Sequence, residues 1–345
     1  MTTSTAAHTS GDPLPAARRG DQSAFERLVA PERGPLLAHC YRMLGSLQDA
    51  EDALQETLVR AWRGLPQFGG RSGLGTWLHR IATNVCLRAI ERRPHLTLPV
   101  GHVPAADPAA PLAPPPVERV WIEPLPDALA AIGDGAASPE ARYEERESVE
   151  LAFVAALQGL PPRQRAALLM RDVLGYAPAE IAEALDTTPA AVYSALQRAR
   201  AAAEEALPDR SQQAVLRAVG DAGVRDTVAR WVSAWEEGDV DALVGMLVDD
   251  AAYAMPPTPT WYRGRDDIRA FLLARPFAEG RRWRTTPVAH NGQLAFVASA
   301  PGPDGRWATH AVEVLTLAAD GRVAEVVAFL DPALVARIAP GPAAA

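Results

Sequence analysis

Apolar residues recur at helical spacing in two stretches near the start of the chain. Over residues 47–65 they return every three or four positions, which places them on one face of a helix. Ser46 precedes this stretch and Asp49 follows three residues later, the arrangement of a capped helix start. A second stretch, from Leu74 to about Arg92, repeats the pattern. Together they predict a helical domain over residues 16–93.

A second helical domain is predicted over residues 140–207, and it contains a helix-turn-helix. Residues 177–185 form a short helix, and a turn at 186–187 leads into the next one. Thr188 supplies the cap of that helix and Pro189 its first position, both of which are start signals. Such a unit places its second helix in the DNA major groove. A helical hairpin that does not bind DNA is the alternative.

The last third of the chain mixes helical and strand periodicities. Two apolar helical stripes over residues 224–247 precede a strand near 252–255 and a helix around 268–272. Strand-like segments then alternate with Asn-Gly or Asp-Gly pairs at 291–292, 304–305 and 320–321, which are strong hairpin signals. This order predicts an α+β cone over residues 222–338. The predicted fold class is therefore multidomain, with two all-α helical domains followed by an α+β cone.

The segments between these domains read as linkers. Residues 94–139 are rich in Pro and Ala, and acids outnumber bases among them. Within this linker, residues 121–127 (WIEPLPD) are too apolar and aromatic for a plain spacer. Trp121 either anchors the path of the linker or packs on a neighbouring domain. A second linker is expected over 208–221, and residues 1–15 and 339–345 are expected to be disordered.

Composition narrows the class of protein. A chain of 345 residues suits two or three domains, and no run approaches the roughly 20 apolar residues of a membrane span. The first residues lack the charged start and apolar block of a signal peptide. The only cysteines, Cys40 and Cys86, have no metal-binding spacing. We therefore expect a cytoplasmic protein without membrane association, disulfide framework, metal site or cofactor.

Charge is unevenly distributed along the chain. The net charge of −8 argues against binding to DNA by bulk electrostatics, which needs clustered Lys and Arg. Arginines nevertheless predominate over residues 71–93. On the polar face of the second helix, Arg80, Asn84 and Arg88 lie one above another, where they suit a phosphate backbone or exposed bases. This pattern indicates DNA contact made with the help of another partner.

The motifs DAEDALQETLVRAW (49–62) and TWLHRIATNVCL (76–87) together resemble the core of sigma-70 factors, in particular the extracytoplasmic-function (ECF) group. The resemblance implies that the polar face of the first helix binds core RNA polymerase. It also implies that loop 69–75 and the second helix open promoter DNA and hold the −10 element. The residues assigned to polymerase are Asp49, Asp52, Gln55, Glu56 and Arg60. The residues assigned to the −10 element are Arg71, Trp77, Arg80, Asn84 and Arg88.

Residues 160–200 resemble the sigma-factor domain that contacts the −35 element. The residues assigned to this DNA are Thr188, Ala190, Ala191, Tyr193, Ser194, Gln197, Arg198 and Arg200. Asp186 replaces the commoner glycine of the turn, which is tolerable because Asp can adopt a positive φ. Tyr193 and Ala195 stand where many relatives carry Lys and Arg, so fewer or differently placed contacts are expected. By the same resemblance, the acidic linker threads through polymerase near its active centre.

The segments at 234–257 and 261–272, with AFLDP at 328–332, resemble a SnoaL/NTF2-like domain, and sigma factors with this appendage form a subgroup. Such a cone encloses an apolar cavity. The candidate ligand-pocket residues are Tyr253, Trp261, Arg263, His310 and Asp331. Asp250 and His290 complete the candidates for catalysis. No spacing among these residues specifies a reaction, and fold alone does not supply one.

Three hypotheses follow. The favoured one is a sigma factor whose partners are core RNA polymerase and promoter DNA, and whose C-terminal domain regulates it in cis. That domain acts by packing on the sigma domains or by sensing a small-molecule ligand, and an anti-sigma protein is a further candidate partner. The second is a ligand-responsive helix-turn-helix regulator that needs no polymerase. The third is an NTF2-like enzyme with a DNA-binding appendage, although we expect no enzyme.

Overall fold

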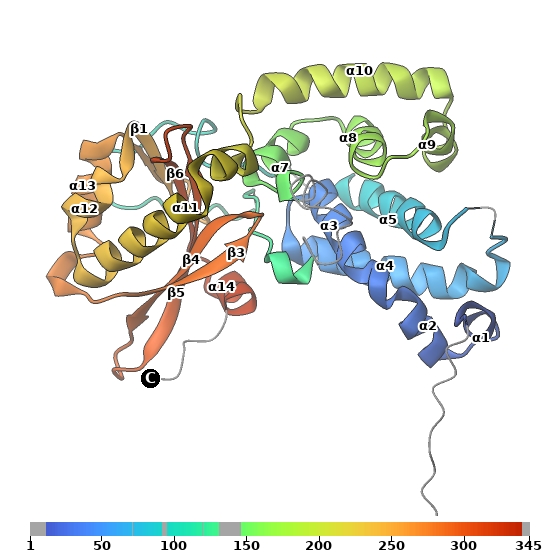
Figure 1. Ribbon diagram of the computed structural model, residues 1–345, viewed down its shortest axis with the longest axis horizontal. Helices are drawn as coiled ribbons and strands as arrows, with labels where there is room; N and C mark the ends of the chain where they lie inside the picture. Colours follow the sequence, from blue (N-terminus) through green and yellow to red (C-terminus); the bar gives the residue numbers. More distant parts are fainter. Residues whose placement is uncertain (1–11, 71, 92–94, 119, 131–145, 340–345) are drawn as a thin grey trace, which may run out of the picture.

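The computed structural model describes residues 12–70, 72–91, 95–118, 120–130 and 146–339 (Figure 1). A helical part lies beside an α+β domain, which confirms the predicted fold class. The chain that follows α5 runs onto the α+β domain and returns to the helical part at α7. None of the helices within these ranges combines the length and apolar character of a membrane span.

The first helical domain is built around a bundle of three long helices. Its elements are α1 (Leu14–Arg18), α2 (Gln22–Val29), α3 (Arg33–Leu44), α4 (Leu47–Gly64) and α5 (Leu74–Ile90). The last three pack together because each turns apolar side chains inward. Ser46 caps α4 as predicted, since its Oγ accepts a hydrogen bond from the backbone N–H of Asp49 at 3.2 Å.

The second helical domain contains the predicted helix-turn-helix. Its elements are α7 (Leu151–Gln158), α8 (Pro162–Leu168), a π-helical turn (Leu169–Val173), α9 (Pro178–Ala184) and α10 (Pro189–Ala206). Thr188 caps α10 by accepting a hydrogen bond from the backbone N–H of Ala191 at 3.2 Å. Asp186 has a φ of 49°, which confirms the left-handed turn between α9 and α10.

The α+β domain consists of one mixed sheet and four helices. The helices are α11 (Gln212–Glu237), α12 (Val240–Gly245), α13 (Arg265–Ala274) and α14 (Pro332–Ile338). The strands are β1 (Leu247–Ala254), β2 (Trp261–Arg263), β3 (Arg284–His290), β4 (Gln293–Pro301), β5 (Trp307–Leu317) and β6 (Val323–Phe329), in the order β2-β1-β6-β5-β4-β3. Only β1 and β6 pair in parallel among these strands. The three predicted Asn-Gly and Asp-Gly turns join β3 to β6 in sequence, as expected.

Both faces of the central strands are buried. In β4, Phe296 and Ala298 pack into the interior of the α+β domain, whereas Ala295 and Val297 join the core of the helical part. Successive side chains of a strand point to opposite sides of its sheet. The sheet therefore separates two cores, and its outer face attaches the α+β domain to the helical part by apolar packing.

Both predicted linkers carry more structure than expected. Within the linker predicted over 208–221, a helical segment begins at Gln212 and is interrupted at Gly220, whose φ of 74° and ψ of 161° are not helical. The described residues of the first linker pack along the α+β domain instead of acting as a spacer. α1 begins at Leu14, inside the segment expected to be disordered. The other domain boundaries stay predictions.

Candidate nucleic-acid interface and interdomain junction

The predicted −35 residues lie together on the open side of α10. Val192, Leu196 and Ala199 face the domain interior, which turns the remaining positions outward. We call the outward positions the recognition face; they are Thr188, Ala190, Ala191, Tyr193, Ser194, Gln197, Arg198 and Arg200, all exposed. Arg200 forms an ion pair with Asp172 at 2.5 Å. Tyr193 is 62% exposed, so this face is available to a partner such as DNA.

The predicted −10 residues on α5 are covered in part by the helix-turn-helix. Arg80 forms an ion pair with Glu183 of α9 at 2.5 Å and donates to the Glu183 carbonyl oxygen at 3.2 Å. Asn84 Nδ2 donates to the carbonyl oxygen of Ala184 at 3.4 Å. Arg88, farther along α5, is exposed. We call Trp77, Arg80, Asn84 and Arg88 the strand face.

Trp77 is a further −10 candidate, and it packs against the loop before α5. Trp77 is half-buried, and its ring centroid lies 4.9 Å from that of Phe68. A cleft beside it is lined by residues 67–69 and 72, by α5 and α9, and by Met170 and Tyr176 of the segment before α9. Arg71 lies outside the described residues. Helix α9 therefore covers Arg80 and Asn84 in the middle of the strand face, whereas Arg88 at its end stays accessible.

The predicted polymerase residues extend along α4. Asp52, Gln55 and Glu56 are exposed, and Arg60 forms an ion pair with Glu56 at 2.6 Å. Asp49 is only 9% exposed, which differs from the predicted solvent face. Glu123 of the linker lies at the first turn of α4, where it accepts from Ser46 Oγ at 2.9 Å and from the Gln48 N–H at 3.3 Å. We call Asp49, Asp52, Gln55, Glu56 and Arg60 the acidic face.

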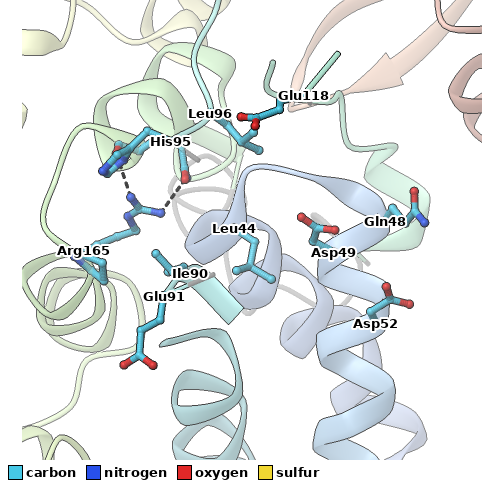
Figure 2. Close-up of a pocket in the computed structure, with 12 residues that line it drawn as sticks. Leu44, Gln48, Asp49, Asp52, Ile90, Glu91, His95, Leu96, Glu118 and Arg165 are labelled. Carbon is cyan, nitrogen blue, oxygen red and sulfur yellow. Dashed lines mark hydrogen bonds between the residues drawn. The ribbon is translucent and has the colours of Figure 1, made fainter. Parts of the chain in front are cut away.

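A cleft of about 550 Å³ opens beside the start of the acidic face (Figure 2). Asp49 and Asp52 line one side of it, and His95, Leu96 and Glu118 of the linker line another. Arg165 of α8 also lines the cleft, and its guanidinium donates to Gln158 Oε1 at 2.5 Å. The linker thus borders the surface that the sequence assigns to polymerase.

Buried polar side chains join the two helical domains. Arg165, 1% exposed, donates to the Met43 carbonyl oxygen of α3, and to Gln158 Oε1 at 2.5 Å. Burial lowers the pKa of Arg165 to about 10, yet the group stays charged at neutral pH. Arg42 of α3 donates to the Ser148 carbonyl oxygen at 2.9 Å. Hydrogen bonds to charged donors of this kind stabilise the packing of α3 against the second helical domain.

The β3–β4 turn inserts between both helical domains and the linker. Asn291 is fully buried, and its Nδ2 donates to Tyr41 Oη of α3 at 2.8 Å and to the Val149 carbonyl oxygen at 2.7 Å. Its Oδ1 accepts from the backbone N–H of Leu125 at 2.9 Å. The next residue, Gly292, donates its backbone N–H to Asp127 Oδ1 at 2.9 Å. One turn therefore bonds to three other parts of the chain.

Residues 121–127 of the linker complete this junction. Trp121 Nε1 donates to the Pro257 carbonyl oxygen at 2.7 Å, so the alternative in which Trp121 packs on a neighbouring domain is confirmed. Glu123 Oε2 accepts from Ser46 Oγ at 2.9 Å, at the cap of α4. Ile122 and Leu125 are fully buried. We call residues 121–127 together with Asn291 and Gly292 the junction.

A buried carboxyl group links the second helical domain to α11. Glu150 precedes α7 and accepts from the backbone N–H groups of Gln212 and Gln213, each at 2.9 Å. These are the first N–H groups of α11, where a carboxylate is favoured. Burial nevertheless raises the pKa of Glu150 to about 7, and the two N–H groups lower it.

The interior of the α+β domain holds a cavity of about 240 Å³. Tyr253 and His310, both predicted pocket residues, line it. Glu313, which is 1% exposed, also lines the cavity and accepts from Tyr253 Oη at 2.7 Å and from Trp231 Nε1 at 3.3 Å. Burial raises the pKa of Glu313 to about 7.

The other pocket and catalytic candidates lie elsewhere. Trp261 donates its indole N–H to the Val103 carbonyl oxygen at 2.8 Å, and Arg263 lies over the Trp261 ring. The reason is that β2 is an edge strand whose outer side is covered by the linker. Asp331 caps α14 by accepting from the backbone N–H of Ala333 at 2.8 Å. Asp250 is exposed on β1.

His290 also has a structural environment. It is 2% exposed and its Nε2 lies 3.2 Å from the Ile338 carbonyl oxygen, while burial lowers its pKa to about 4. Residues that the sequence did not single out instead join the domains: Arg42, Glu150 and Arg165. One signal was available for Glu313, since it is a lone acid in the apolar strand HAVEVLTL (310–317).

Comparisons with known proteins agree with these three units. The profile of Sigma-70 region 2 matches residues 28–94, that of Sigma-70 region 4 matches 150–202, and that of the SnoaL-like domain matches 228–326. The ECF RNA polymerase sigma factor SigG of Mycobacterium tuberculosis is 45% identical over 322 residues, covering 92% of this chain and 83% of SigG. SigJ of the same species is 27% identical over 321 residues, covering 90% and 91% of the two chains.

The crystal structure of M. tuberculosis SigJ shares the fold, with a TM-score of 0.57 and 23% identity over 90% of this chain and 98% of SigJ. Two helical domains with a helix-turn-helix and an attached SnoaL-like domain define the class of sigma-70 transcription factors with a C-terminal extension. The chain belongs to the ECF RNA polymerase sigma factors. The function predicted from the sequence is thereby confirmed at this level.

Proposed function

We propose that this sigma factor binds core polymerase through the acidic face and promoter DNA through the recognition and strand faces. The exposed carboxylates of Asp52 and Glu56 offer a charged docking surface on a rigid helix. The recognition face presents the N-terminal half of a capped helix, which is the part that enters the major groove in such motifs. Arg80 and Asn84 are suited to hold a separated strand once α9 no longer covers them.

We further propose that the C-terminal domain regulates the sigma domains in cis, through the junction. The observation that carries this proposal is the fully buried Asn291, which hydrogen-bonds to α3, to the linker and to the chain just before α7. A turn bonded to all three parts favours the arrangement in which α9 covers the strand face. Release of the turn removes that restraint, so the domain acts as a switch and not as a separate catalyst.

A second contact supports the same role. Arg337 of α14 forms an ion pair with Glu51 of α4, next to Asp52 of the acidic face. Exposed pairs of this kind contribute about 0–1 kcal/mol, so this contact fixes position more than stability. It brings the C-terminal helix to the edge of the surface that we assign to polymerase. A separate anti-sigma protein stays a prediction.

A single methyl group provides the test. A Cβ added at Gly292 would lie 2.9 Å from Arg146 Cβ and 3.0 Å from the Arg146 carbonyl oxygen, so Gly292→Ala wedges the junction open. Gly305 has a similar positive φ in the β4–β5 turn, and nothing lies within 4 Å of its added Cβ. Gly305→Ala therefore carries the same backbone strain without the wedge.

The readout is transcription in vitro from a pool of random promoter sequences with actinobacterial core polymerase. We expect Gly292→Ala to raise transcript yield several-fold over both the wild type and Gly305→Ala. Equal yields from the two variants would remove the proposal of cis regulation. Failure of the full-length chain to bind core polymerase under any condition would remove the assignment of the acidic face.

A further inference from the structure

The cavity of the α+β domain has a buried apolar interior and a cationic mouth. Its inner lining comes from strands β4 to β6 and includes Ala298, Ala311 and Ala328, all buried. Its aromatic walls are Trp235, Tyr253, Phe271 and Trp283, also buried. At about 240 Å³ it lies below the roughly 300 to 1,000 Å³ of sites for drug-sized ligands, so it suits a molecule of one or two rings.

Two of the polar groups in this lining bear on what the cavity can bind. The first is Glu313, held by Tyr253 Oη and Trp231 Nε1. The second is Trp235, which is 2% exposed and whose indole N–H has no acceptor among the described residues. A buried donor without an acceptor is unfavourable, and an oxygen atom of a bound molecule would relieve it.

Positive charge gathers where the cavity meets solvent. Arg275 and Arg281 are exposed lining residues, and the Arg281 guanidinium lies 5.6 Å from the centroid of the Trp283 ring. Glu313 is the only carboxylate among the lining residues that the structure describes. Because burial raises the pKa of Glu313 to about 7, its carboxyl group carries little negative charge below neutral pH. The cavity therefore favours an anionic group at its mouth.

The linker closes part of the same mouth. Leu112 is a lining residue and packs against the interior core. The chain around it is held by two hydrogen bonds, from Arg275 Nη2 to the Ala110 carbonyl oxygen at 3.2 Å and from the backbone N–H of Ala113 to Thr260 Oγ1 at 3.1 Å. An anion that binds Arg275 competes with the first of these bonds, and a ring that fills the mouth competes with Leu112.

We propose that this cavity is a binding site for a small aromatic carboxylate. The ring lies among Trp235, Phe271 and Trp283, the carboxylate pairs with Arg275 and Arg281, and the bound molecule displaces Leu112 from the mouth. Displacement loosens residues 110–113 from the α+β domain, so the attachment of the linker to this domain depends on whether the ligand is bound. The binding site stands by itself, whereas its consequence for transcription rests on the cis regulation proposed above.

The first test measures binding to the full chain by calorimetry. The probes are benzoate, 1-naphthoate and indole-3-acetate. The uncharged alcohol 1-naphthalenemethanol is the control for 1-naphthoate. We expect saturable binding of at least one acid, with 1-naphthoate at least tenfold tighter than its alcohol. Arg281→Ala should weaken acid binding several-fold, the loss expected for an ion pair at an exposed position. Arg282→Ala is the matched control, because Arg282 is an exposed neighbour outside the cavity lining.

The second test addresses the linker. Leu112→Ala should tighten binding of the acid several-fold, whereas Val117→Ala, at a fully exposed linker position, should leave it unchanged. Amide hydrogen exchange at residues 106–113 should quicken when the acid is bound. Absence of binding by all three acids, equal affinity for acid and alcohol, or equal losses in Arg281→Ala and Arg282→Ala would overturn the site. These measurements need no polymerase, so their failure is distinct from failure of the transcription test.

Discussion

The substitution Asn291→Gly isolates the polar contribution of the junction. Asn291 has a φ of 54° within an Asn-Gly turn, and Gly adopts that conformation freely. The variant therefore keeps the β3–β4 turn and deletes only the side chain. That side chain makes three buried hydrogen bonds, to Tyr41 Oη, the Val149 carbonyl oxygen and the Leu125 N–H.

The magnitude follows from those three bonds. A buried hydrogen bond contributes about 1 kcal/mol net, so the variant loses about 3 kcal/mol of the free energy that holds the junction closed. At about 1.4 kcal/mol for each factor of ten, opening becomes about 100-fold more frequent. The apolar packing between the sheet and the helical part is retained, so the global fold should persist.

Amide hydrogen exchange of the peptide covering residues 121–127 measures that opening directly. The exchange rate of a protected amide follows the opening equilibrium of its segment. We expect about 100-fold faster exchange in this peptide and unchanged exchange in peptides from α10 and β5. Asp320→Gly is the control, because among the described residues the Asp320 side chain bonds within its own exposed turn, to Arg322. An acceleration below tenfold, or one spread evenly over the chain, would refute the role of Asn291 as the restraint.

Three further predictions concern the faces and the buried acid. Arg80→Ala should reduce open-complex formation at least tenfold while leaving the affinity for core polymerase unchanged; equal losses in both would mean that α5 is only structural there. Thr188→Ala should lower the free energy of unfolding by about 1 kcal/mol through loss of the α10 cap, whereas Tyr193→Ala should change promoter affinity and not the melting temperature. Glu313 has a folded-state pKa near 7, against a usual value of 4.5. Its favourable contribution to the free energy of unfolding is therefore fully present below about pH 4.5 and is lost as pH rises through 7. The melting temperature of Glu313→Gln minus that of the wild type should therefore increase from pH 5 to pH 8. A constant difference over that range would contradict the burial argument.

Much of the local structure was predictable because its causes are local. A capped start and a regular apolar stripe specified α4, and the Thr188 cap with a proline behind it specified α10. The hairpin turns followed from Asn-Gly and Asp-Gly pairs, whose backbones favour positive φ. The outward position of Tyr193 also followed from helical periodicity alone. Each of these features is decided by residues within a few positions of one another.

The linkers show where that reasoning stops. Residues 208–221 have the composition of a spacer, yet a helix begins at Gln212, where the local cap Ser211 accepts from the Ala214 N–H and Glu150, from another part of the chain, accepts from the first two N–H groups. Trp121 left two alternatives open, and the choice between them depended on the Pro257 carbonyl oxygen, which is 136 residues away. The sequence also left open which candidates line the cavity. Tyr253 and Trp261 lie on neighbouring strands, but Tyr253 lines the cavity, whereas Trp261 bonds to Val103 of the linker.

The sequence by itself determined the family, the two helical domains, the helix-turn-helix and the α+β fold, since their signals lie in short, ordered motifs. Only the tertiary structure decided that α9 covers Arg80, that Asn291 enters a buried junction, and that the sheet buries both faces. The physical reason is that a hydrogen bond or ion pair between distant segments leaves no periodic trace in the sequence. Such contacts exist only when packing brings the two partners together and excludes water from both.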